Sequence, residues 1–356
     1  MTIPVVSRTF KHTKNCAFEV AFGGVYTSIS GSIVELQESA LSRILLFFLS
    51  LCLVALTAWS NTAVPASEHD KPIAAGALSG LYRDAGLNSP VVLIVPGSGP
   101  TDLNGNNSLG IESNVYMQMS AALAAYGIST VRVDKRGMFS SRAAGDPNAV
   151  TVDVYAQDYR DWVEIIRAET NQSCVYMLGH SEGALMVSAA AINNENVCGL
   201  ILVSGAGRPL GDILREQLNA NPANKPILKQ AFTAIDSLER GEKVDTTKLN
   251  SALHPLFATQ VQDFLISLIS TDPAKVAAAA DTDTLIVHGK NDIQTSTLDA
   301  QKLAVATGGQ LVVIGGVNHI LKEAPMNRVE NIATYSNPDL PVSESVITAI
   351  REFIFR

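Results

Sequence analysis

A glycine-flanked serine in the middle of the chain could act as a nucleophile. Residues 178–184 read Leu-Gly-His-Ser-Glu-Gly-Ala, a G-x-S-x-G pattern with Ser181 at its centre. The apolar run 174–177 before it reads as a buried strand, and residues 183–187 begin a plausible helix. Small residues two positions before and after the serine permit a sharp strand-to-helix turn that exposes its hydroxyl. Ser181 is therefore a candidate nucleophile, and an ordinary glycine-rich turn is the alternative.

A carboxylate and an imidazole follow two later apolar runs. Asp292 comes after residues 284–287, and His319 comes after residues 311–314. In open α/β sheets ligands bind beyond the carboxyl ends of the strands, so both side chains are expected at the edge where Ser181 lies. Nucleophile, acid and base then occur in the chain order of α/β-hydrolase triads.

These three side chains have complementary chemistry. A serine hydroxyl needs a base to take its proton, and imidazole titrates near neutral pH. The carboxylate would fix the tautomer of His319 and stabilise the imidazolium ion. Of the six histidines, His319 is the best placed for this role. The arrangement predicts hydrolysis through an acyl-enzyme on Ser181.

Two backbone N–H groups are candidates for an oxyanion hole. One belongs to Glu182, directly after the nucleophile, and the other to Ser98 in the loop 96–102, Pro-Gly-Ser-Gly-Pro-Thr-Asp. A phosphate-binding loop is the weaker interpretation, because Asp102 occupies the last glycine position of a G-x-G-x-x-G pattern. Residues 134–137, Asp-Lys-Arg-Gly, also follow a strand; an ion pair that holds the loop is favoured over substrate contact.

Alternating elements from Pro90 onward position these residues. The expected strands are 91–95, 130–133, 174–177, 200–203, 284–287 and 311–314, and the main expected helices are 115–123, 155–168 and 343–355. Strands that are apolar throughout and separated by helices indicate a mostly parallel sheet covered on both faces. The fold class predicted is an α/β-hydrolase fold.

Residues 207–280 interrupt this alternation with helical stretches and several prolines. We predict that they form an inserted helical cap, with residues 61–206 and 281–356 as the hydrolase core; long crossover helices are the alternative. Four apolar cap residues could close over an acyl chain or pack against one another, and packing is favoured: Phe257, Phe264, Leu265 and Ile269.

Residues 1–60 read as a leader. Arg43, the apolar run 44–56 and the small-x-small sequence 58–60 have the layout of a secretory signal near residues 43–60, which predicts a periplasmic or secreted protein. An uncleaved anchor is the alternative and the one route to a membrane. We expect the natural start near Leu41 or Ser42, with the upstream part a mis-assigned extension.

Composition limits the classes of molecule that we expect this protein to bind. A net charge of −8 and a pI near 5.3 argue against nucleic acid. Cysteine and histidine spacing shows no metal motif, so no metal site is predicted. After cleavage of the leader, Cys174 and Cys198 remain; in an oxidising compartment they form a disulfide if their Cα atoms lie within about 7 Å, and otherwise stay buried thiols.

Four motifs together resemble the bacterial EstD-type α/β-hydrolases, which include secreted carboxylesterases. They are 97–102 (Gly-Ser-Gly-Pro-Thr-Asp), 134–137 (Asp-Lys-Arg-Gly), 179–183 (Gly-His-Ser-Glu-Gly) and 318–322 (Asn-His-Ile-Leu-Lys). The resemblance extends from about Leu78 to the carboxyl terminus. It implies Ser181, Asp292 and His319 as the triad and hydrolysis of short acyl esters without a cofactor.

One departure from the family pattern is visible. The family loop often continues with Arg-Asp, whereas Leu103 and Asn104 stand here; any role of charge in this loop is in doubt, but the backbone donors are intact. The sequence predicts a serine carboxylesterase acting on a small-molecule ester. The alternatives are a peptidase or amidase with the same triad, and a catalytically silent α/β-hydrolase-fold binding protein.

Overall fold

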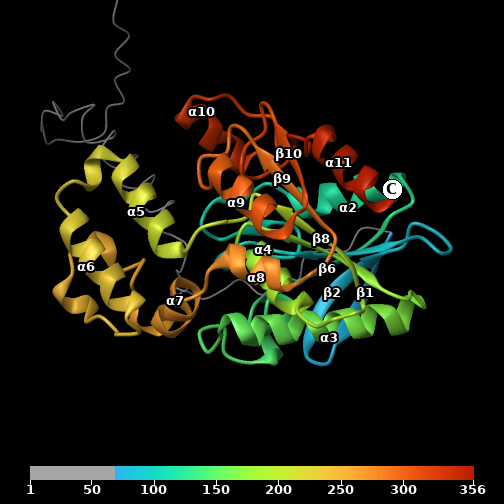
Figure 1. Cartoon of the computed structure of the whole chain (residues 1–356), viewed down its shortest axis with the longest axis horizontal. Coiled ribbons are helices and arrows are strands. Elements are labelled where there is room, and N and C mark those ends of the chain that lie inside the picture. The colour runs from blue at the N-terminus through green and yellow to red at the C-terminus, as the bar shows by residue number, and fades with distance from the viewer. Residues whose placement is uncertain (1–68) are drawn as a thin grey trace, which may run out of the picture. The chain divides into compact units, whose positions relative to one another are not determined.

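A computed structural model describes residues 69–356 (Figure 1). The predicted leader, residues 1–60, and its secretory signal lie outside the described residues. Within residues 69–356, every helix is too short or too polar to span a membrane.

An eight-stranded sheet organises this part of the chain. In spatial order its strands are β1 (Asp70–Ala75), β2 (Leu78–Arg83), β6 (Ser129–Val133), β3 (Val91–Val95), β7 (Val175–His180), β8 (Val197–Val203), β9 (Thr284–Gly289) and β10 (Gln310–Ile314). All neighbours from β6 to β10 pair in parallel, whereas β1 pairs antiparallel with β2 and β2 antiparallel with β6. The six parallel strands are those expected from the sequence, and the predicted fold class is confirmed.

The two antiparallel strands, β1 and β2, were not predicted from the sequence. β1 lies at the edge of the sheet, and its residues are mostly exposed or half-buried. Such a strand lacks the continuous apolar run by which the buried parallel strands were found. A further hairpin, β4 (Asn106–Asn107) with β5 (Ile111–Glu112), is too short to leave a periodic pattern.

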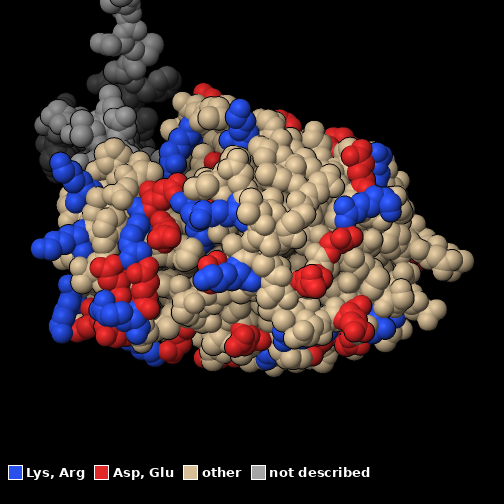
Figure 2. Space-filling model, in the orientation of Figure 1, with Lys and Arg blue, Asp and Glu red and all other residues tan. Residues whose placement is uncertain are grey.

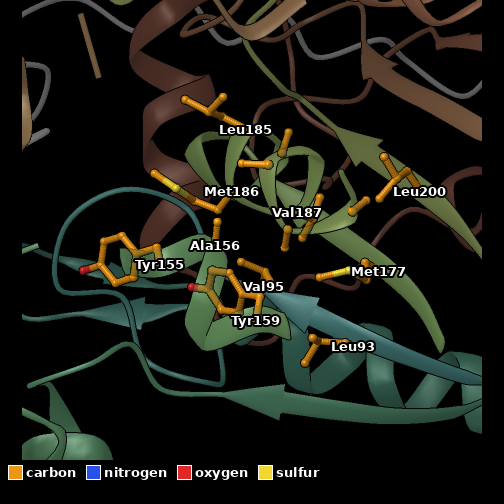
Figure 3. Packing of buried hydrophobic residues seen from close by; sticks show 14 of the residues in the cluster. Leu93, Val95, Tyr155, Ala156, Tyr159, Met177, Leu185, Met186, Val187 and Leu200 are labelled. Atoms are coloured by element: carbon orange, nitrogen blue, oxygen red, sulfur yellow. The ribbon is translucent and has the colours of Figure 1, made fainter. Parts of the chain in front are cut away.

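Helices cover both faces of the sheet (Figure 1). Alternate residues of β3 face opposite layers, as expected for a strand buried on both sides. Leu93 and Val95 pack with α3 (Val152–Thr170), α4 (Glu182–Ala191), α8 (Pro273–Ala279) and α9 (Thr297–Thr307). Val92 and Ile94 pack with α2 (Val115–Ala125) and α11 (Glu344–Ile354). Figure 3 shows part of the layer that Leu93 and Val95 face, including Met186 from α4.

The local sequence of helix α3 explains where the helix begins, which face it buries and where it ends. Thr151 caps its start, because the threonine side chain accepts a hydrogen bond from Val154 N–H. Tyr155, Tyr159 and Trp162 recur at helical spacing and are buried against the sheet. The chain leaves the helix at Asn171, in the left-handed conformation that asparagine tolerates.

Strand order creates a crevice between β3 and β7. From β3 the chain crosses to β6 on one side and then returns to β7 on the other, so β3 has parallel neighbours on both sides. Where successive connections diverge in this way, ligands bind beyond the carboxyl ends of the strands. The loop after β3 carries Ser98, and the turn after β7 carries Ser181.

A second apolar core lies outside the sheet layers. It is enclosed by α5 (Leu210–Ala220), α6 (Leu228–Glu239) and α7 (Gln262–Ile269), which group to one side in Figure 1. Phe257, Leu265 and Ile269 belong to this core, whereas Phe264 packs against the sheet layer. Charged side chains gather over these helices in Figure 2, many of them in ion pairs such as Arg215 with Glu239. This core lies within the predicted insertion 207–280, whose last helix, α8, packs instead with the sheet layer.

A disulfide joins Cys174 and Cys198, whose Cα atoms are 5.2 Å apart. Cys174 directly precedes β7, and Cys198 is the second residue of β8. The cross-link therefore lies at the amino ends of two neighbouring strands, at the edge of the sheet opposite to Ser181.

Removal of this cross-link should lower stability without changing the fold. The two cysteines are 24 positions apart in the sequence, and a disulfide that closes a loop of that size stabilises a protein by about 3 kcal/mol. We expect Cys174→Ala/Cys198→Ala to lose about that much free energy of unfolding in urea. Reductant should destabilise the native protein and leave the double variant unchanged; equal sensitivity of both proteins would contradict the prediction.

Candidate active site

Ser181 occupies a strained turn between β7 and α4. Its φ is 56° and its ψ is −120°, a conformation that costs a non-glycine residue about 1–3 kcal/mol. Two glycines make the turn possible. A Cβ on Gly179 would lie 2.3 Å from the Gly183 carbonyl oxygen, and one on Gly183 would lie 2.7 Å from the Pro96 carbonyl oxygen. The predicted need for small residues on both sides of the serine thus has a direct steric cause.

Asp292 and His319 lie in hydrogen-bond contact at the same edge of the sheet. His319 Nδ1 is 2.8 Å from Asp292 Oδ2, and both side chains are buried. An ionised carboxylate accepts hydrogen bonds, so Nδ1 carries the proton and Nε2 is left as a base. The N–H groups of Gln294 and Thr295 donate to Asp292 Oδ1 at 2.7 and 3.0 Å and hold the carboxylate in place.

The surroundings of Asp292 keep it ionised. Burial by itself would raise its pKa, but the neighbouring His319, its hydrogen bond and His288 lower the pKa to about 2. A buried carboxylate at neutral pH is thereby available to orient an imidazole and to stabilise its protonated form.

Ser181 and His319 line one cavity of about 80 Å³. The structure thus brings all three predicted triad residues to one edge of the sheet. Among the hydrogen bonds of the described residues, none joins Ser181 Oγ to His319. Such contacts are often long in free enzymes and shorten when substrate binds.

His180, directly before Ser181, connects the loops around the site. Gly97 N–H donates to the Tyr116 hydroxyl oxygen at 3.0 Å, and that hydroxyl lies 2.7 Å from His180 Nδ1. His180 Nε2 lies 2.7 Å from the His319 carbonyl oxygen. Because a carbonyl can only accept, Nε2 carries the proton and the tyrosine hydroxyl donates to Nδ1. The chain of hydrogen bonds therefore has a single direction, from the loop after β3 to the loop that carries His319.

His180 is held neutral. Burial, and next the nearby His319, lower its pKa to about 3. A neutral imidazole is required here, because a protonated ring could not accept the hydrogen bond from Tyr116.

The residues of the two predicted oxyanion donors line one cavity together with Ser181. Ser98 and Glu182 both line a second cavity of about 60 Å³ that also includes Ser181. Glu182 is the first residue of α4, so its N–H has no partner within the helix. The buried carboxyl of Glu182 has a raised pKa because of burial, although Lys135 and a hydrogen bond from the Ser98 side chain act in the opposite direction.

The motif at 134–137 is held within the protein. Asp134 Oδ1 accepts a hydrogen bond from Leu103 N–H at 2.9 Å, and Arg136 pairs with Asp158. Lys135 Nζ donates to the Gly97 carbonyl oxygen at 2.8 Å and lies 4.0 Å from Glu182 Oε1.

Two residues of the site were not singled out from the sequence. Tyr116 lies on a helix where an aromatic side chain indicates core packing, and it is fully buried. His180 was noticed only as the neighbour of Ser181. A histidine directly before the nucleophile was the available signal, but its partners are 64 and 139 positions away. The described residues contain no group of His, Cys, Asp or Glu arranged to hold a metal ion.

Comparisons with known proteins agree with this architecture. A family described as serine aminopeptidase, S33, matches residues 107–323, more than half of the chain. Esterase EstD from Thermotoga maritima is 25% identical over 237 residues, which cover 65% of this chain and 54% of EstD. The chain thus matches about half the length of that relative.

Solved structures show the same fold. Est1E from Butyrivibrio proteoclasticus has a TM-score of 0.50 at 16% identity, covering 81% of this chain and 100% of its own. The α/β hydrolase GrgF from Penicillium sp. sh18 has a TM-score of 0.50 at 18% identity, covering 78% of this chain and 93% of its own.

The neutral state of His180 should make stability depend on pH. The folded chain binds a proton on His180 only near pH 3, whereas the unfolded chain binds it near pH 6.5. The unfolded state thus holds more protons in this range, and stability falls as pH falls, by up to about 1.4 kcal/mol per pH unit. We expect urea unfolding from pH 7 to pH 4 to show this slope, and His180→Gln to be less stable at pH 7 with a shallower slope. Equal slopes would show that His180 does not titrate on unfolding.

Proposed function

Because this chain belongs to the serine aminopeptidase S33 family of α/β-hydrolases, we propose that it is a serine hydrolase of carboxylic esters. The observation that carries the proposal is the Asp292–His319 pair, whose imidazole lines one cavity with the strained Ser181. The similarity to a protein described as an esterase, EstD, supports ester hydrolysis.

The proposed reaction proceeds through an acyl-enzyme. Ser181 Oγ attacks the acyl carbon as His319 Nε2 takes the hydroxyl proton. The negative oxygen of the tetrahedral intermediate accepts hydrogen bonds from the N–H groups of Ser98 and Glu182. When the bond to the alcohol oxygen breaks, His319 gives the proton to that oxygen. A water molecule, deprotonated by His319, then attacks the acyl carbon and releases the acid and free Ser181.

The position of His319 indicates which cavity would hold the alcohol part of the ester and which the acyl part. The leaving oxygen must lie within reach of His319, so the alcohol part occupies the cavity of about 80 Å³ that His319 lines. The acyl part extends the other way, into the cavity of about 60 Å³. Its walls are mainly apolar: Leu185, Leu210, Ile213, Leu268 and Pro273. We therefore propose esters of short apolar acids as the substrate class.

Charge around Ser181 supports an ester rather than an N-terminal peptide substrate. An aminopeptidase needs a carboxylate that pairs with the substrate ammonium group. Among the described residues that line the two cavities, Glu182 is the one carboxylate. Its side chain is 6% exposed and already faces Lys135, so it is not available to a substrate amine.

We also propose that the protein works outside the cytoplasm. The Cys174–Cys198 disulfide supports an oxidising compartment, in agreement with the secretory signal expected from the sequence.

A fluorophosphonate probe tests the proposed nucleophile. We expect the native protein to be labelled and Ser181→Ala not to be, with hydrolysis of p-nitrophenyl butyrate lowered about 10⁴-fold or more. Ser270→Ala is the matched control, because it removes an exposed serine hydroxyl that donates to the carbonyl oxygens of Ile266 and Ser267. Labelling of Ser181→Ala equal to that of the native protein would exclude the proposal. Faster cleavage of aminoacyl anilides than of esters would favour a peptidase.

Replacing a residue in the wall of each cavity by tryptophan tests the orientation of the substrate. Ile213→Trp narrows the proposed acyl cavity, and Leu109→Trp narrows the opposite one. Rates should be compared for p-nitrophenyl esters from acetyl to octanoyl, and for acetate esters of increasingly large alcohols. We expect Ile213→Trp to disfavour long acyl chains by about 10-fold or more and to leave the alcohol preference unchanged, with the reverse for Leu109→Trp. An exchange of these two profiles would reverse the assignment.

A further inference from the structure

Lys135 is a buried cation that donates a hydrogen bond to a backbone carbonyl group. Its side chain is 3% exposed, and its Nζ donates to the Gly97 carbonyl oxygen at 2.8 Å. Glu182 Oε1 lies at 4.0 Å, beyond hydrogen-bond distance. Burying an ammonium group is costly unless the group is paired and hydrogen-bonded. The contact with the Gly97 carbonyl ties this buried cation to the loop after β3.

The Gly97 carbonyl belongs to the same peptide unit as the Ser98 N–H. A trans peptide is planar, and its C=O and N–H point in opposite directions. A hydrogen bond that holds the carbonyl toward Lys135 therefore turns the Ser98 N–H away from Lys135. Among the described residues, no backbone or side-chain acceptor takes a hydrogen bond from this N–H, and Ser98 lines both cavities that meet at Ser181.

The backbone N–H group of Gly97 is also held by a hydrogen bond. Its own N–H donates to the Tyr116 hydroxyl at 3.0 Å. The residue lies against the nucleophile, because a Cβ added to Gly97 would be 3.2 Å from the Ser181 Cβ. With both polar groups of Gly97 engaged, the peptide that follows it has little freedom to rotate.

We propose that Lys135 is a positioning residue that fixes the Gly97–Ser98 peptide so that the Ser98 N–H can bind the oxyanion. This inference rests on the proposed function, because it assigns the orientation of one of the two donors. Lys135 does not touch the substrate. Its ammonium group also faces the carboxyl of Glu182, directly after the nucleophile, and so offsets a negative charge beside the place where the oxyanion forms.

Lys135→Met tests the inference, because it removes the ammonium group and keeps a stem of similar length. Loss of one oxyanion donor lowers kcat about 100- to 1000-fold, and a donor that is only released should cost less. We expect kcat for p-nitrophenyl butyrate to fall about 10- to 100-fold, with KM changed less than about 3-fold. The affinity for a butyl trifluoromethyl ketone, which forms a tetrahedral adduct on the serine, should fall by the same factor as kcat/KM.

Two controls separate this role from a structural one. Arg136→Gln changes the neighbouring cation, which pairs with Asp158 away from Ser181, and should keep kcat within about 3-fold of the native value. Lys135→Arg retains a donor and should recover part of the lost kcat. A Lys135→Met protein that is less stable but has native kcat and native ketone affinity would overturn the proposal.

A double variant separates the hydrogen bond from the charge. Lys135→Met/Glu182→Gln removes both charges and avoids an unpaired buried carboxylate, so it also serves if the single variant does not fold. If Lys135 acts through the Gly97 carbonyl, the double variant keeps the kcat defect. Recovery of native kcat would show that Lys135 acts only by compensating Glu182, and the positioning role would be wrong. Labelling of the native protein by fluorophosphonate, measured in parallel, shows whether the proposed function itself holds.

Discussion

The close approach of two backbone segments at the carboxyl ends of β3 and β7 is the constraint on which the rest of the site depends. Gly183, in the first turn of α4, lies so near to Val95 and Pro96 that a methyl group in place of its hydrogen would meet their carbonyl oxygens at 2.7 Å. This contact brings the loop after β3 against the turn that carries Ser181. A larger residue at Gly183 would push the turn that carries Ser181, the proposed nucleophile, away from the loop that carries Ser98, a proposed oxyanion donor.

Buried polar groups then join the loops that no backbone ladder connects. The loop after β3, the turn after β7 and the loop after β10 are linked through Gly97, Tyr116, His180 and the carbonyl of His319. Each group in this chain has one allowed protonation state, because each donor must meet an acceptor. Rotation of one member would leave a buried polar atom unpaired, so the network favours a single arrangement of the three loops.

The sequence was most informative where burial is complete. The five inner parallel strands and the Ser181 turn could be predicted because a strand covered on both faces is apolar throughout and a tight turn demands glycine. The edge strand β10 is exposed or half-buried over most of its length, and it was found from its apolar run alone. Helix α9 was missed because its apolar stripe is weak: Leu298 and Val305 are exposed, and Leu303 is buried. The partners of Lys135 could not be predicted either. Its ion pair with the Glu182 carboxylate is longer than its hydrogen bond to the Gly97 carbonyl, and no side-chain pattern encodes a carbonyl partner.

The separate core of α5, α6 and α7 bears on how such a protein can diversify. These helices pack around apolar residues of the same segment, such as Leu265 on α7 and Phe257 between α6 and α7, while Ile213 on α5 lines the smaller cavity beside Ser181. Substitutions at that lining can alter the shape of the cavity without disturbing the strands and loops that hold Ser181, Asp292 and His319. Selection could therefore retune substrate preference through the helical segment while the reaction chemistry is inherited unchanged, which makes the two properties separable units of evolution.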